Sequence, residues 1–89
     1  MVQTTFRGAW VKKMLVYVLL NVDPSKEHLV YNRLTKDDSI KEVYPLFGEY
    51  DILVEFDAPE KENIGTVVQE KILSLDGVLA TKTLTGMGV

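Results

Sequence analysis

Phe47-Gly48-Glu49-Tyr50-Asp51 is the stretch of this sequence that decides its fold. Two segments with the composition of β-strands flank it, residues 39–47 and residues 50–57. A pair of residues led by glycine fits a tight hairpin, because glycine tolerates the positive φ at the first central position of a type II′ turn. We therefore predict a β-hairpin with two carboxylates and a phenol at its tip. By composition alone, these polar residues are those of an ordinary solvated turn.

Residues 14–22 form an alternating segment in which both alternating sets are apolar. The two sets are Met14, Val16, Val18, Leu20 and Val22, and Leu15, Tyr17 and Leu19. A strand with one face in water would carry polar residues at every second position. We therefore predict a strand that is covered on both sides and lies in the interior of its sheet.

Two helices are predicted between the strands. The first begins with Asp23 as its N-cap and Pro24 at its first position, where the missing N–H of proline is harmless. The second is predicted to open at Asp57-Ala58-Pro59 and to end before Gly77, a residue suited to the left-handed position after a helix. A last strand is predicted over residues 78–85.

The predicted order β-α-β-β-α-β is that of the ferredoxin-like α+β fold. Its usual strand order, 4-1-3-2, places residues 14–22 inside the sheet and the strand that contains Pro45 at an edge, where a missing N–H is tolerated. Two helices can cover only one face of such a sheet. The apolar residues of the other face therefore predict a homodimer that packs sheet against sheet as a dimeric α/β barrel.

Length and composition indicate one small domain. The chain has 89 residues, of which 46% are hydrophobic and 26% charged, as in ordinary globular proteins. It has no cysteine, which excludes disulfides, thiol catalysis and thiolate metal sites and fits a cytoplasmic protein. No apolar run approaches the length of a membrane span.

Residues 1–13 differ in character from the rest, with basic residues, no acid and no sustained hydrophobic period. We predict an N-terminal extension at residues 1–13 and one domain at residues 14–89. Without the extension the basic residues fall from 10 to 7 against 13 acids, which leaves a formal charge near −6. Binding to a phosphate backbone calls for a basic face, so we expect no direct nucleic-acid binding by this chain.

Four segments fall in the order and spacing of the effector-binding (RAM) domain of the leucine-responsive Lrp/AsnC regulators, which the sequence resembles over about residues 14–84. They are Asn21-Val22-Asp23-Pro24-Ser25, Ile40-Lys41-Glu42-Val43-Tyr44, Gly48-Glu49-Tyr50-Asp51-Ile52 and Asp76-Gly77-Val78-Leu79-Ala80-Thr81-Lys82-Thr83. The resemblance implies a module of transcription regulation that binds an amino acid or similar effector, with no enzymatic activity, cofactor or metal. Residues 1–13 are too few for the family's helix-turn-helix domain. A stand-alone effector domain that co-assembles with full-length relatives is therefore implied.

The resemblance also implies a site. In the family, effectors bind between dimers near the hairpin tip, and dimers often assemble further into rings. Carried over to this sequence, the effector-binding residues are Gly48, Glu49, Tyr50, Asp51, Thr81 and Thr83. Backbone N–H groups at a glycine turn suit an α-carboxylate, while a carboxylate or a threonine hydroxyl suits an α-ammonium. Phe47 stands where many members carry threonine, which leaves the identity of the effector open.

Two alternatives remain open. One is a small enzyme of the same barrel architecture, a cofactor-free monooxygenase or an isomerase. For such chemistry the chain offers Asp51 and Glu55 on one predicted strand face, and His28 on a predicted helix. A lone helical histidine is more often a surface residue than a catalytic group or metal ligand. The other alternative is an assembly domain that binds no small molecule, in which Asp51 pins the hairpin and the threonines are ordinary strand residues.

Overall fold

The computed structural model describes residues 13–59 and 63–86. The strands are β1 (Lys13–Val22), β2 (Glu42–Pro45), β3 (Ile52–Pro59) and β4 (Val78–Gly86), and the helices are α1 (Glu27–Thr35) and α2 (Ile64–Val68). A 3-10 turn, η2 (Pro24–Lys26), precedes α1, and a π-helical turn, η3 (Gln69–Leu73), continues α2. The predicted extension, apart from Lys13, lies outside the described residues. No helix in the described part of the chain is long and apolar enough to cross a lipid bilayer.

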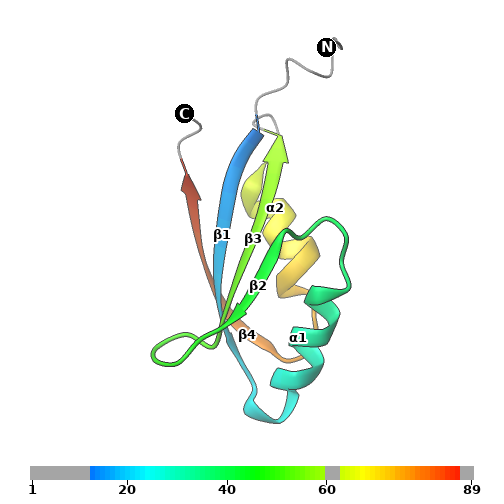
Figure 1. The fold of residues 1–89 in the computed structure, drawn as a ribbon, viewed down its shortest axis with the longest axis vertical. Coiled ribbons are helices and arrows are strands. Elements are labelled where there is room, and N and C mark those ends of the chain that lie inside the picture. Colours follow the sequence, from blue (N-terminus) through cyan, green and yellow to red (C-terminus); the bar gives the residue numbers. More distant parts are fainter. Residues whose placement is uncertain (1–12, 60–62, 87–89) are drawn as a thin grey trace.

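The four strands form one antiparallel sheet in the order β2-β3-β1-β4, with both helices on the same face (Figure 1). This arrangement confirms the predicted ferredoxin-like fold and its strand order. The short strand with Pro45 lies at an edge, and β1 lies inside the sheet between β3 and β4, as its two-sided hydrophobicity predicts.

The core lies between the sheet and the helices. Its buried side chains are Val16, Val18, Leu20 and Val22 from β1, Ile52, Val54, Phe56 and Ala58 from β3, Val30 and Leu34 from α1, Val68 from α2 and Ile72 from η3. Full burial of one large aliphatic side chain stabilises a fold by about 1.5–3 kcal/mol. The alternation of buried residues along β1 and β3 therefore fixes which face of each strand meets the helices, since a slip of one residue would turn the whole set outward.

The connection between β2 and β3 is longer than predicted. The expected two-residue hairpin is wrong: β2 ends at Pro45 and β3 begins at Ile52, so that residues 46–51 form a loop, here called the β2–β3 loop. Proline has no N–H to continue a strand ladder. The N–H of Leu46 instead donates to the carbonyl of Asp51 (2.8 Å) and closes the loop at its base. Gly48 has a positive φ of 125°, as expected of a glycine in this turn.

The second helix begins later than predicted. Asp57, Ala58 and Pro59 continue β3, because β1 extends to Lys13 and pairs with this end of the strand. Helix α2 starts at Ile64 with Asn63 as its N-cap, whose side-chain oxygen accepts a hydrogen bond from the N–H of Thr66 (3.3 Å). The predicted opening is thus a strand end, where Ala58 is buried in the core.

The predicted start of the first helix is confirmed. The carboxylate of Asp23 accepts hydrogen bonds from the N–H (3.0 Å) and the hydroxyl (2.8 Å) of Ser25. The N–H of Asp23 donates to the carbonyl of Gly77 (2.8 Å), which joins the start of the helix to the start of β4. Gly77 has a positive φ of 104°, but its predicted position directly after the second helix is wrong: the helix ends at Leu73 with Ser74 as its C-cap, and Gly77 lies in the turn that leads into β4.

The sheet face opposite the helices, here called the open face, is apolar at its centre. Leu15, Tyr17 and Leu19 of β1 point to this face and are half-buried within one chain. Leu53 of β3 and Leu84 of β4 lie beside Leu19 and Tyr17 in the strand register. No helix in the described part of the chain covers this apolar centre, which is the surface that the predicted homodimer requires.

Candidate functional site

The β2–β3 loop is fixed to the end of β1 by three hydrogen bonds. The N–H of Asp51 donates to the carbonyl of Leu20 (2.8 Å), and the Asp51 Oδ2 accepts from the N–H of Val22 (2.9 Å). The side-chain amide of Asn21 donates to the carbonyl of Glu49 (2.8 Å). The loop therefore projects from the end of the sheet with a base that is held by the central strand (Figure 1).

The tip of the loop presents three different groups to solvent. Phe47 has an exposed fraction of 107%, so its ring is free of contact with the rest of the described chain. Gly48 and Glu49 are also exposed, while Tyr50 is half-buried. An aromatic ring, a backbone with left-handed geometry and a carboxylate therefore lie next to one another on a supported loop.

The two predicted threonines lie on β4 rather than on the loop. Thr81 is opposite Leu20 and Thr83 is opposite Val18 in the β1–β4 register, so both lie on the helix-side face of the sheet. Thr81 is half-buried and Thr83 is exposed. Because β1 separates β4 from β3, a single chain brings the four loop residues together but does not bring the threonines to them.

The acids enlisted for the enzyme alternative are engaged in other contacts. The carboxylate of Asp51 binds the backbone of Val22, and that of Glu55 lies 3.9 Å from the Nζ of Lys41. Within residues 13–59 and 63–86, no group of three or more histidine and acidic side chains could hold a metal ion. Each of the two carboxylates thus contacts a partner other than the second acid.

Altered ionisation is found at the start of the first helix, in the segment between α1 and β2, and on the open face. Hydrogen bonds from the backbone N–H and hydroxyl of Ser25 lower the pKa of Asp23, and the Ser39 hydroxyl is the main cause of the lowered pKa of Asp37. A 2.7 Å hydrogen bond to Asp76 raises the pKa of Lys26. On the open face, the charge of Glu42 raises the pKa of the Tyr44 hydroxyl. These shifts concern stability rather than the β2–β3 loop.

A second feature, which the sequence did not predict, is a hollow beside α1. It is lined by Pro24, Glu27, His28, Tyr31, Pro45 and Ile52 and has a volume of about 530 Å³. The local signal is the spacing of Pro24, Glu27, His28 and Tyr31, at i, i+3, i+4 and i+7 and hence on one side of a helix. The strand residues that complete the hollow join them only through the tertiary fold.

The structure is a small ferredoxin-like domain with a supported loop at one end of its sheet. The sequence model of the Lrp/AsnC ligand binding domain matches residues 15–88. The chain therefore belongs to the Lrp/AsnC family of transcriptional regulators, within which it is a ligand-binding domain.

Similar proteins agree with this assignment. An uncharacterized HTH-type transcriptional regulator of Pyrococcus furiosus is 32% identical over 71 residues, which are 76% of this chain and 47% of the relative. The chain thus spans about half the length of that curated relative. A Thermus thermophilus protein with a crystal structure is 26% identical in sequence to this chain. The two structures superpose with a TM-score of 0.76 over 85% of this chain and 95% of the other.

A transcriptional regulator of Neisseria meningitidis, solved as a complex with L-Met, shares the fold. It is 16% identical, with a TM-score of 0.71 over 84% of this chain and 50% of the other. The family consists of transcriptional regulators and not of enzymes, so the prediction of a non-enzymatic, effector-binding regulatory role is confirmed. The enzyme alternative is set aside on that ground.

Proposed function

We propose that this chain binds an amino acid as its effector, at the β2–β3 loop, and that a second copy of the chain completes the site. The observation that carries the proposal is the loop itself, whose exposed tip stands on a base held by three hydrogen bonds to β1. A loop that is already ordered loses little conformational entropy when it binds a ligand. Its glycine backbone and the Glu49 carboxylate suit the two charges of a zwitterion.

The proposed site comprises residues from two places in the fold, namely Gly48, Glu49, Tyr50 and Asp51 of the loop and Thr81 and Thr83 of β4. Within one chain β1 stands between the two groups. We infer that they meet around one ligand where two copies contact each other. In this proposal Asp51 supports the loop through Val22, and the exposed Glu49 is the carboxylate available to the ligand.

The proposed assembly is a homodimer formed through the open face, with further association of dimers into a ring. Burial of Leu15, Tyr17 and Leu19 against a second sheet removes apolar surface from water, which is the main driving force of obligate dimers. Co-assembly with full-length relatives, which carry the helix-turn-helix domain, would link effector binding to DNA. The L-Met complex of the Neisseria regulator makes methionine the first amino acid to test.

A thermal-shift screen of the common amino acids tests the proposal. A ligand present at a hundredfold excess over its Kd stabilises the native state by about 2.7 kcal/mol. For a domain of this size that corresponds to a rise in Tm of roughly 10 °C or more. A flat response to every amino acid would contradict the proposal and favour an assembly domain that binds no small molecule.

Calorimetric titration of threonine variants then tests the site. Thr83→Val removes a hydroxyl from the proposed site, and Thr85→Val removes one from the same face of β4, two residues further along and opposite Val16. We expect Thr83→Val to weaken binding several-fold, since a hydrogen bond is worth about 0.5–1.5 kcal/mol. Thr85→Val should bind as wild type does. Equal affinities for the two variants would remove Thr83 from the site.

A further inference from the structure

We infer that the hollow beside α1 is a second ligand site, for a small molecule that carries a positively charged amine on an apolar body. This inference goes beyond the proposed function, because the hollow shares no residue with the β2–β3 loop site. Its volume of about 530 Å³ falls within the range of about 300–1,000 Å³ that is usual for small-molecule sites. The hollow is therefore large enough for a ligand of the size of an aromatic amine.

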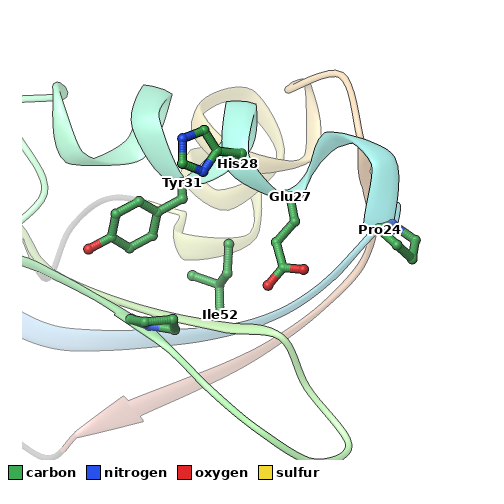
Figure 2. Close-up of a pocket in the computed structure, with 6 residues that line it drawn as sticks. Pro24, Glu27, His28, Tyr31 and Ile52 are labelled. Carbon is green, nitrogen blue, oxygen red and sulfur yellow. The ribbon is translucent and has the colours of Figure 1, made fainter.

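The polar groups of the hollow come from one stretch of helix, and the residues opposite them come from the strands. Figure 2 shows that the side chains of Glu27 and Tyr31 leave α1 toward the strands, with Ile52 projecting from β3 between them. Glu27 and Tyr31 are both half-buried, and Ile52 is only 1% exposed. Because Ile52 is almost fully covered, the apolar surface that a ligand seated there would meet comes mainly from Pro24, Pro45 and the ring of Tyr31, with the Glu27 carboxylate beside it.

The charge of the hollow favours a cation. Glu27 is the one carboxylate among the described residues that line it, and none of them is a lysine or an arginine. Within the described residues Glu27 forms no ion pair. The neighbouring Lys26 is directed to Asp76 instead, at 2.7 Å. An ammonium group beside Glu27 would therefore neutralise a half-buried charge, whereas an anion would be repelled.

Tyr31 adds to the same preference. Its phenol ring lies on the strand side of α1 and offers a negatively polarised face to a cation, while its hydroxyl can donate or accept a hydrogen bond (Figure 2). A carboxylate near a helix start also interacts favourably with the helix dipole, which gives Glu27 a role in stability. A role of Glu27 in helix stability does not explain why a hollow lies beside it. The test therefore has to measure ligand binding and stability separately.

The test uses 2-phenylethylamine as the probe, with its neutral analogue 2-phenylethanol and the anion phenylacetate as controls. Each is titrated into the ¹⁵N-labelled full chain at pH 8, and binding is followed by backbone amide chemical shifts. The informative amides are those of Glu27, His28, Tyr31 and Ile52, since the two prolines of the hollow have no N–H. We expect saturable shifts at these amides with the amine and not with phenylacetate.

Two variants assign the effect to the carboxylate. Glu27→Gln should weaken binding of the amine about tenfold or more, as loss of a charged hydrogen bond does. Glu70→Gln removes a carboxylate from the first turn of η3 and should leave the affinity unchanged. Urea unfolding of both variants checks that the fold is intact. The inference would be overturned by equal binding of the amine, the alcohol and the acid, by unchanged affinity in Glu27→Gln, or by shifts at amides 48–51 alone.

The same titration keeps this inference distinct from the proposed function. Amino-acid binding at the β2–β3 loop would shift amides 48–51 and depend on Thr83, whereas amine binding in the hollow would shift the amides of α1 and depend on Glu27. The absence of binding at one of the two proposed sites would therefore not contradict binding at the other.

Discussion

The Oδ2 of Asp51 accepts a 2.9 Å hydrogen bond from the backbone N–H of Val22, so a side chain of the β2–β3 loop pairs with the last residue of the central strand. The two residues are 29 positions apart in the sequence. The contact is partly buried, which makes an unpaired N–H costly there. Asp51 is in the first place a residue that holds the loop to β1.

Asp51→Ala removes this acceptor and should lower the free energy of unfolding by about 1–3 kcal/mol, the cost of a buried donor without a partner. Asp51→Asn keeps a side-chain oxygen and should lose less. Urea unfolding of the two variants measures the difference. Indistinguishable losses in Ala and Asn would show that the charge of Asp51, and not its acceptor atom, supports the loop.

Asn21→Leu removes the hydrogen bond between the Asn21 amide and the Glu49 carbonyl. We expect faster amide hydrogen exchange in the β2–β3 loop and no change in the β1–β4 ladder, because only the loop loses an anchor. Asn32→Leu, at an exposed position of α1, is the matched control. Uniformly faster exchange through the whole sheet would show that Asn21 supports the fold rather than the loop.

The two glycines with positive φ should differ in their response to alanine. At Gly77 a Cβ atom would lie 2.8 Å from the Cβ of Lys26 and 3.1 Å from the Cγ2 of Val30, so a steric clash adds to the backbone strain. At Gly48 no atom of the described chain would lie within 4 Å of an added Cβ atom. Only the backbone strain of the positive φ remains there, at about 1–2 kcal/mol. Chemical denaturation should therefore find Gly77→Ala less stable than Gly48→Ala. The reverse order would contradict the packing of Gly77 against α1.

Leu19→Asp should dissociate the proposed dimer or unfold the chain, because a carboxylate buried without a partner costs several kcal/mol. Leu29→Asp is the matched control, since Leu29 lies on α1 with 62% of its surface exposed. Light scattering gives the molar mass and circular dichroism reports the fold. A folded wild-type monomer at micromolar concentration, or dissociation by Leu29→Asp alone, would place the dimer contact elsewhere.

The chain should lose stability in acid partly through Asp23 and Asp37. Hydrogen bonds from Ser25 and Ser39 lower the pKa of these carboxyl groups in the native state. The unfolded chain then binds protons more readily than the native state does. The two carboxylates therefore contribute to the free energy of unfolding above about pH 4, and this contribution is lost as the pH falls through their lowered native-state pKa values. Asp37→Asn should flatten the fall in the free energy of unfolding below about pH 4. The adjacent Asp38→Asn is the control, and an equal flattening there would contradict the assignment.

Much of the fold follows from a few residues read locally. The apolar residues on both sides of β1 place that strand inside the sheet, and Pro45 places β2 at an edge, which together fix the strand order. Asp23 marks a helix start because its side-chain preference acts over only a few residues, whereas Gly77 marks the turn before β4 and not the helix end, which is at Leu73. The site residues of the loop came from the resemblance to the Lrp/AsnC domain.

The parts that sequence patterns missed depend on contacts between distant residues. The loop is longer than a hairpin turn because the β2–β3 ladder ends at Pro45, and Asp51 is held by β1 as well as by Leu46; Asp57-Ala58-Pro59 stays in the sheet because Lys13 lies opposite its end. The hollow beside α1 forms only where Pro45 and Ile52 meet the helix. A local pattern holds no information on such pairings.

The anchoring of the β2–β3 loop bears on how this domain could diversify. The bond between Leu46 and Asp51, and the bond from Asn21 to Glu49, both end on backbone atoms of the loop, so neither depends on the side chains at positions 47, 49 and 50. None of these three positions belongs to a strand, so their replacement leaves the register of β2 and β3 unchanged. At the effector site proposed here, substitution of the tip residues can therefore change the ligand preference of the domain while its fold stays the same.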